Sequence, residues 1–297
     1  MTLTLVLLAA GMGSRFGGLK QLEPVGPGGA TLMDYSVYDA ERAGFTRVVF
    51  VIRPEMAGEF ETQVLGRYRK RLEVRVVLQR LEDLPPGFEV PPDRLRPWGT
   101  GQAVLAARDQ VPGAFAVLNA DDFYGREALA EIAAFLRAPA SPDACAVIGY
   151  RLDQTASLEG GVNRATLEQD RKGFLRRIVE VRNLSVASVG RFRGEVEAEP
   201  RIVAADALVS MNLWGLTPSI FPRLARGFEA FLVRSPGPRA EYYLPEAIQG
   251  MLAEGVVSVK VIPTESRWCG MTHPGDRQRV ESFLQDLVAA GEYPPSL

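Results

Sequence analysis

The chain begins with an uninterrupted apolar run over residues 3–9, and Gly11 follows it almost at once. A strand without polar alternation is typical of a parallel sheet whose two faces are both covered, and such a strand usually lies near the middle of the sheet. Helix-like and strand-like segments then alternate up to residue 150, which predicts right-handed parallel crossovers. The sequence therefore predicts an α/β fold with a mainly parallel sheet flanked by helices.

The pattern changes in the second half of the chain, where strand-like segments follow one another without regular helices between them. This change indicates antiparallel additions laid over the first sheet. In the first half we expect strands at residues 47–52, 72–78, 114–118 and 143–150, and helices at 32–40, 54–65, 103–108 and 126–136. In the second half we expect strands at 164–168, 173–182, 205–214 and 256–262, and helices at 218–232, 242–254 and 275–290.

Length, charge and cysteine content limit the classes of protein to which the chain can belong. Its 297 residues suit one domain, with residues 1–150 as the core and residues 151–297 as additions and closing helices. The net charge of −2 and the lack of a broad basic patch argue against nucleic-acid binding. The two distant cysteines, Cys145 and Cys269, fit a reducing cytoplasm, and residues 1–10 are too short to span a membrane.

Glycines and basic residues follow the first strand within residues 8–20. Gly11 and Gly13 allow backbone N–H groups to approach phosphate oxygens, and Arg15 and Lys20 add positive charge. The spacing differs from the dinucleotide fingerprint, the second strand ends without the acidic residue that binds a ribose, and the pattern is not a P-loop. We therefore expect a nucleotide triphosphate site here, with a simple tight turn as the alternative.

Two aspartates, Asp121 and Asp122, stand at the carboxyl end of a predicted strand. Ligands of open α/β sheets bind at this position, and carboxylate oxygens are ligands that Mg²⁺ prefers. Mg²⁺ typically takes one or two carboxylates and completes its coordination with substrate phosphates. The sequence thus predicts a Mg²⁺ cofactor held by Asp121 and Asp122, with helix capping near Gly125 as the alternative for Asp122.

These motifs together resemble those of the sugar-1-phosphate nucleotidyltransferases, which include the glucose-1-phosphate thymidylyl- and uridylyltransferases. Residues 8–20 resemble the family's L-A-A-G-x-G-x-R loop with its downstream lysine, and residues 98–103 resemble its base-recognition turn. The resemblance implies a Rossmann-like sheet with an added sugar-binding region, and catalytic roles for Arg15, Lys20 and Asp121. The nucleotide-binding residues that it implies are Ala10, Gly11, Gly13, Ser14, Gln79, Gly99, Thr100 and Gln102.

The antiparallel additions of the second half, which we expect to form the region that binds the phosphorylated acceptor, resemble the family less closely. The resemblance implies acceptor contacts from Asn163, Glu180, Arg182, Asn212 and Trp214. Residues 180–182 depart from the family's E-K-P pattern, and Arg182 is the substitute for its phosphate-binding lysine. Where many members carry a second metal-binding aspartate, this chain has Cys269 and Gly270, and Asp276 is the nearby replacement or else an acidic residue that stabilises a helix start.

The partners expected are a nucleoside triphosphate and a phosphorylated small-molecule acceptor, and the oligomeric state stays open. The reaction expected is attack by an acceptor phosphate oxygen on the α-phosphorus, which forms an NDP-sugar and releases pyrophosphate. Three alternatives are open: a non-sugar acceptor such as phosphocholine, a metal-dependent glycosyltransferase, and an idle nucleotide-binding regulator. The identities of the base and of the acceptor cannot be read from one sequence.

Overall fold

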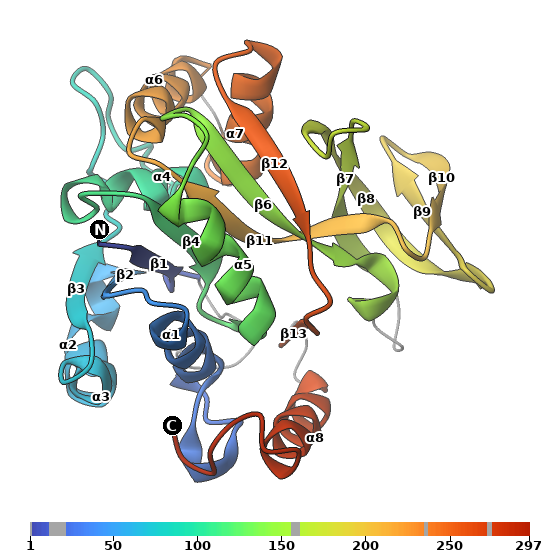
Figure 1. Cartoon of the computed structure of the whole chain (residues 1–297). Coiled ribbons are helices and arrows are strands. Elements are labelled where there is room, and N and C mark those ends of the chain that lie inside the picture. Colours follow the sequence, from blue (N-terminus) through green and yellow to red (C-terminus); the bar gives the residue numbers. More distant parts are fainter. Residues whose placement is uncertain (1, 12–21, 156–160, 235–236, 272–274) are drawn as a thin grey trace.

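The computed structural model describes residues 2–11, 22–155, 161–234, 237–271 and 275–297. In these residues one 11-stranded sheet runs through the molecule, and helices cover both faces of its parallel part (Figure 1). None of the described helices is both long and apolar enough to cross a membrane. The helices are α1 (Leu32–Arg42), α2 (Ala57–Phe60), α3 (Gly66–Tyr68), α4 (Thr100–Ala106), α5 (Arg126–Arg137), α6 (Ile220–Val233), α7 (Leu244–Ala253) and α8 (Asp276–Ala289).

The sheet contains the parallel core that the first half of the sequence predicts. The strands of the first half are β1 (Thr4–Leu8), β2 (Arg47–Ile52), β3 (Glu73–Leu78), β4 (Phe115–Asn119), β5 (Asp122–Phe123) and β6 (Ala144–Arg151). β1 lies between β2 and β4 and is parallel to both, and β3 is parallel to β2 at the edge. The predicted α/β fold and the central place of the first strand are confirmed.

All the later strands except the last continue this same sheet, so the expectation that they lie over it was wrong. They are β7 (Val162–Gln169), β8 (Leu175–Ser188), β9 (Arg191–Val196), β10 (Glu199–Ala204), β11 (Leu208–Leu216), β12 (Ser258–Pro263) and β13 (Cys269–Gly270). β11 is antiparallel to β4, β6 and β7, and it therefore joins the parallel core to the antiparallel strands β7 to β10. β13 pairs only with β5, in a separate two-stranded sheet.

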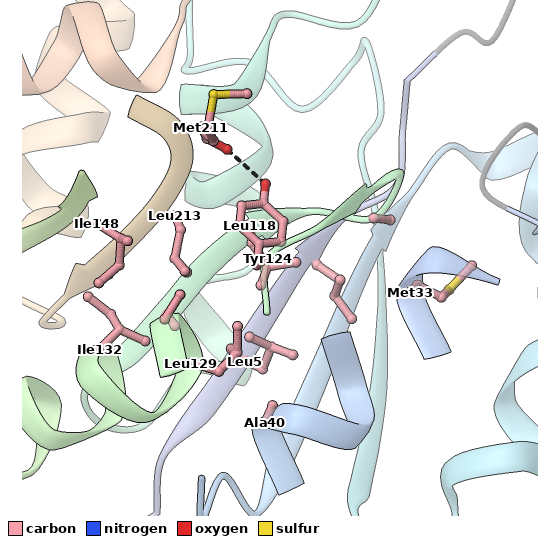
Figure 2. Packing of buried hydrophobic residues seen from close by; sticks show 14 of the residues in the cluster. Leu5, Met33, Ala40, Leu118, Tyr124, Leu129, Ile132, Ile148, Met211 and Leu213 are labelled. Carbon is pink, nitrogen blue, oxygen red and sulfur yellow. Dashed lines mark hydrogen bonds between the residues drawn. The ribbon is translucent and has the colours of Figure 1, made fainter. Parts of the chain in front are cut away.

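Alternate residues of β1 point into two separate hydrophobic clusters. Leu5 and Leu7 pack with residues of α1, α2, α3 and α5, whereas Val6 and Leu8 pack with residues of α4, α6 and α7. Figure 2 shows the first of these clusters, with Leu5 between Ala40 of α1 and Leu129 of α5. The burial of both faces explains why the first strand lacks polar alternation. We call these two sides of the sheet the α1/α5 face and the α4/α7 face.

One buried carboxyl makes the stability of this core dependent on pH. Asp39 of α1 is 1% exposed, and the Tyr293 hydroxyl donates a hydrogen bond of 2.5 Å to its Oδ2. Burial raises the pKa of Asp39 from 3.8 to about 7. The folded state therefore holds this proton more tightly than the unfolded state does, and stability falls as the pH rises from about 4 to about 7.

We expect Asp39→Asn to remove this dependence, because an amide stays neutral while its oxygen can still accept the Tyr293 hydrogen bond. Relative to the native chain, the variant should gain on the order of 2–3 kcal/mol in unfolding free energy between pH 5 and pH 8. Urea unfolding at the two pH values measures the gain. Asp109→Asn is the control, because the Asp109 side chain is 81% exposed. An equal effect of Asp39→Asn at both pH values would contradict the prediction.

Candidate active site

The glycine-containing segment and the acidic segment meet at the carboxyl edge of the parallel strands. The Ala9 amide donates to the Val51 carbonyl at 2.9 Å, and the Ala120 amide donates to the Leu8 carbonyl at 3.1 Å. Residues 9–11 therefore leave the sheet between the ends of β2 and β4, directly beside the segment that carries Asp121. Ala10 and Gly11 lie in this junction. The predicted phosphate-binding residues Gly13, Ser14, Arg15 and Lys20 lie outside the described residues.

The two aspartates occupy the short connection between β4 and β5. Asp121 lies in the turn, Asp122 begins β5, and both side chains are half-buried. The side-chain nitrogen Nδ2 of Asn119 donates to Asp122 Oδ2 at 3.0 Å. Helix capping by Asp122 was the wrong alternative, because α5 begins after Gly125, which has a φ of 84° and no side-chain cap. A pair of carboxylates at this edge fits the ligand set of Mg²⁺ with substrate phosphates.

A chain of hydrogen bonds connects Asp122 to the neighbouring strand β11. The Trp214 indole nitrogen donates to Asn212 Oδ1 at 2.9 Å, and Asn212 Nδ2 donates to Asn119 Oδ1 at 2.8 Å. Asn119 in turn donates to Asp122, so each amide has a single favourable orientation. The φ of Asn212 is 67°, a left-handed conformation that asparagine adopts more readily than most residues. Trp214 is fully buried, so the structure places it behind Asn212 in this chain.

The Tyr124 hydroxyl connects the segment that carries the aspartates to β11 by hydrogen bonds. It donates to the Met211 carbonyl at 2.9 Å and accepts from the backbone amide of Asn119 at 3.1 Å. Figure 2 shows the bond to Met211. The ring is 1% exposed, and burial, followed by the nearby Asp122 charge, raises the pKa of its hydroxyl well above 10.0. The hydroxyl therefore stays protonated and continues to donate at physiological pH.

The two glutamines predicted to face the base contact each other. Gln79 follows β3 and Gln102 lies in the first turn of α4, and they are 5% and 2% exposed. Gln79 Nε2 donates to Gln102 Oε1 at 2.7 Å and to the Gly99 carbonyl at 3.0 Å. The structure therefore brings together three of the predicted nucleotide-binding residues near the carboxyl ends of β2 and β3.

The turn before α4 is fastened to the segment before α7. Thr100 Oγ1 accepts a hydrogen bond of 2.9 Å from the Leu244 amide, and the Gly101 amide donates to the Tyr242 carbonyl at 2.8 Å. Gly99 has a φ of 102°, and a Cβ there would lie 2.7 Å from the Tyr242 carbonyl oxygen. This position therefore requires glycine for both its backbone conformation and its close approach.

The predicted acceptor residues fall on different sides of the sheet. Glu180 and Arg182 alternate on β8 with the buried Val179 and Val181, which pack on the α1/α5 face. Glu180 and Arg182 therefore point to the α4/α7 face and are exposed. Partial desolvation raises the pKa of Glu180, while the charges of Arg182 and Arg164 oppose that shift. Asn212 instead lies near the aspartates, because it is connected to Asp122 through Asn119 by the hydrogen bonds described above.

Asn163 lies on β7 and supports the strand pairing. Its Oδ1 accepts from the Asn183 amide at 3.0 Å, at a point where the β7–β8 register shifts. Asn183 has a φ of 53°, which suits the irregular backbone there. The structure thus gives Asn163 a role in the loop geometry beside the acceptor region.

Arg164 ends the segment 161–164, which resembles a sugar-contacting loop of the family, but only Asn163 of that segment was among the predicted acceptor residues. Arg164 is half-buried on β7, and its guanidinium lies 5.1 Å from the centre of the Trp268 ring. It donates to the Thr155 carbonyl, to Thr155 Oγ1 at 3.3 Å and to the Asn163 carbonyl at 2.8 Å. Burial lowers its pKa, and Asp122 is the acidic residue that most opposes this shift. Only the strand register reveals this placement, because the sequence shows a single arginine in a mixed segment.

The segment with Cys269 and Gly270 reaches the aspartates through β13. Gly270 pairs with Asp122, and a Cβ at position 270 would overlap Asp122 Oδ1. The Asp122 carboxylate thus occupies the space that a side chain at position 270 would need. Cys269 is buried, and burial raises the pKa of its thiol to about 11, so it stays protonated near neutral pH. A thiolate nucleophile is therefore not available at Cys269.

Asp276 lies at the first position of α8 and is 8% exposed. Arg279 Nη2 donates to its Oδ1 at 3.4 Å, and its charge contributes to the raised pKa of Cys269. Asp122, Cys269 and Asp276 therefore lie in one neighbourhood. No group of three or more His, Cys, Asp or Glu side chains in the described ranges is arranged to hold a metal ion by itself. A Mg²⁺ ion here would depend on substrate oxygens for the rest of its coordination.

Comparisons with known proteins agree with this geometry. The family model of the MobA-like NTP transferase domain matches residues 5–183. The chain is 27% identical over 303 residues to the bifunctional protein GlmU of Chromohalobacter salexigens, which covers 98% of this chain and 56% of the relative. The chain therefore spans about half the length of that curated relative.

Two solved structures share the fold. A putative glucose-1-phosphate thymidylyltransferase from Bacillus anthracis, in complex with a sucrose, matches with a TM-score of 0.63 and 14% identity over 96% of both chains. A UDP-glucose pyrophosphorylase complexed with UDP-glucose matches with a TM-score of 0.59 and 15% identity, over 96% of this chain and 99% of that one. At these identities the similarity shows a common fold.

Proposed function

Because the chain belongs to the MobA-like NTP transferase domain family and is a nucleotidyltransferase, we propose that it transfers a nucleoside monophosphate from a nucleoside triphosphate to a sugar 1-phosphate. Pyrophosphate leaves and an NDP-sugar forms. The proposal treats residues 1–297 as one domain, in which residues 1–150 bind the nucleotide and residues 151–297 provide the acceptor contacts.

The observation that carries this proposal is the junction of the glycine segment with the acidic segment. Ala9 and Ala120 are each hydrogen-bonded to the end of a neighbouring parallel strand, so the segments that carry Gly11 and Asp121 leave the sheet at adjacent strand ends. Strand β11, which brings Asn212 to the same place, joins this edge to the antiparallel strands. A triphosphate bound along the glycine segment would therefore present its α-phosphorus between the aspartates and an acceptor.

Each group has a separate task in the proposed reaction. Arg15 and Lys20 neutralise the triphosphate, and Gln79, Gln102 and Thr100 lie where the base would bind. Asp121, assisted by Asp122, would hold Mg²⁺, which neutralises charge on the phosphate oxygens when it is bound. An oxygen of the acceptor phosphate forms a bond to the α-phosphorus as the bond to pyrophosphate breaks, so no covalent enzyme intermediate is required.

A sugar acceptor is supported by the resemblance of residues 8–20 and 98–103 to sugar-1-phosphate nucleotidyltransferases. The names of the two solved structures are consistent with it, since both refer to glucose-containing compounds. Phosphocholine is the principal alternative acceptor. The acceptor strands of this chain depart most from the family pattern, and these strands decide the choice.

The test is pyrophosphate release, in the presence of Mg²⁺, across the common nucleoside triphosphates and dTTP paired with several sugar 1-phosphates and phosphocholine. We expect release that depends on both substrates and is largest for one sugar 1-phosphate. Release only with phosphocholine would replace the sugar acceptor. Nucleotide binding without any release would contradict the proposal, and release of a nucleoside diphosphate from an NDP-sugar would indicate glycosyl transfer instead.

A further inference from the structure

Arg164 is a cation in a desolvated place without an acidic partner. Its hydrogen bonds go to Thr155 and to the Asn163 carbonyl, and it forms no ion pair with any carboxylate in the described ranges. A desolvated charge is costly unless it is paired, whether with a side chain or with a ligand. A guanidinium also has five N–H donors, and three hydrogen bonds leave part of this capacity unused.

The pairing register puts Arg164 on the same face as the metal-binding aspartates. Arg164 lies opposite Val181 in the β7–β8 ladder, and directly opposed residues point to the same face. Val181 packs on the α1/α5 face, where Tyr124 and Trp268 also pack and where the Ser36 hydroxyl of α1 contacts the Asp122 carbonyl. Burial lowers the pKa of Arg164, and Asp122 is the acidic residue that most opposes this shift, although the two form no ion pair. Arg182, in contrast, points to the α4/α7 face.

A second unsatisfied donor lies beside Arg164. Trp268, whose ring the guanidinium covers, is 9% exposed, and its buried indole nitrogen has no hydrogen-bond partner. Buried N–H groups without partners are uncommon in folded proteins. Two adjacent side chains therefore offer donors that the described residues do not satisfy. The indole nitrogen is buried, so the half-buried guanidinium is the group that a negatively charged ligand rich in acceptor oxygens would meet.

We propose that Arg164, rather than Arg182, binds the phosphate of the acceptor, with the guanidinium positioned by Trp268 and Thr155. This inference rests on the proposed function and specifies which cation of the chain recognises the second substrate. A phosphate held by Arg164 would lie on the same side of the sheet as Asp122, and one of its oxygens could then attack the α-phosphorus. The fork of an arginine matches the geometry of phosphate oxygens.

The experiment compares Arg164→Gln with Arg182→Gln, a matched removal of one charge from each face. In the pyrophosphate assay, Arg164→Gln should raise KM for the acceptor by roughly 10- to 100-fold, the effect of losing a charged hydrogen bond, and leave KM for the nucleotide within about threefold. Arg182→Gln should leave both within about threefold. Arg164→Lys keeps the charge but loses the fork, so its acceptor KM should be intermediate.

A binding titration that needs no turnover gives a second readout. Glucose 1-phosphate, and separately inorganic phosphate, are added to the full chain while tryptophan fluorescence is followed, with Trp268→Phe identifying the signal. Binding should weaken in Arg164→Gln and persist in Arg182→Gln, with thermal unfolding checking that both variants fold. If Arg164→Gln does not fold, Arg164→Lys must show the weaker binding.

The outcomes separate this inference from the proposed function. Wild-type chain that binds either probe through Arg164 but releases no pyrophosphate would contradict the function and keep the phosphate site. Three results would overturn the assignment. The first is an equal loss in the two glutamine variants, and the second is an unchanged acceptor KM together with unchanged probe binding in Arg164→Gln. The third is the failure of both probes to bind to the wild-type chain.

Discussion

Replacing Asp121 with alanine is expected to lower turnover by about 100- to 1,000-fold, the loss typical when a charge-stabilising group is removed from an active site. Asp121 lies in the turn between β4 and β5, next to the strand end from which Gly11 emerges. In the proposed reaction its carboxylate would hold Mg²⁺ against the triphosphate. Without it, the negative charge on the attacked phosphate would be less neutralised, and attack by a second phosphate would slow.

The measurement is pyrophosphate release at saturating substrates, with Asp121→Asn as the nearly isosteric variant. Asp109→Asn is the matched control, because the Asp109 side chain is 81% exposed at the end of the helical segment after α4. Asp121→Asn should also weaken the binding of Mn²⁺, followed by electron paramagnetic resonance, which is a readout independent of turnover. A folded Asp121→Ala chain with wild-type turnover in Mg²⁺ would show that Asp121 is not the metal ligand.

Local patterns in the sequence were sufficient to predict the parallel core. The apolar run of residues 3–9 has no polar alternation because both faces of β1 are covered, and this signal lies entirely within one strand. The position of Asp121 could be predicted for a similar reason, because it follows the strand β4 directly. Features that depend on neighbours in the sequence were therefore predicted with nearly correct boundaries.

The antiparallel half was predicted less completely because its features depend on pairing between distant segments. β9 and β10 are rich in exposed arginine and glutamate and lack a continuous apolar run, so neither strand was predicted. The contact between Asn212 and Asn119 joins residues 93 positions apart across a register shift in β11. The face on which Arg164 lies likewise follows from its pairing with Val181, which no local pattern encodes.

Pairing between distant segments also explains why Gly270 stands where many family members carry a second metal-binding aspartate. In the sequence, Cys269 and Gly270 look like the loss of an acidic ligand. In the fold, Gly270 pairs with Asp122, whose carboxylate fills the space above the glycine. In the proposed metal site, the second carboxylate would therefore come from Asp122, the residue adjacent to Asp121. This arrangement requires a small residue at position 270, which the sequence alone does not reveal.

Replacing Tyr124 with phenylalanine is expected to lower the free energy of unfolding by about 2–4 kcal/mol, because one hydroxyl serves two buried backbone groups. It donates to the Met211 carbonyl and accepts from the Asn119 amide, so its loss leaves both groups without this partner. For a chain of this size, the change should lower Tm by roughly 3–6 °C. Thermal and urea unfolding measure the two quantities.

Tyr150→Phe is the matched control for this prediction, because the Tyr150 ring is also fully buried and its hydroxyl makes one bond, to the Tyr124 carbonyl at 2.8 Å. Its loss should cost about 1 kcal/mol, as for a single hydrogen bond. Tyr124→Phe should also reduce turnover, because the Tyr124 hydroxyl bonds the Asn119 amide and lies 3.4 Å from Asp122 Oδ2. If the two variants lose the same stability, the second buried backbone group bonded by the Tyr124 hydroxyl adds nothing measurable, which would contradict the prediction.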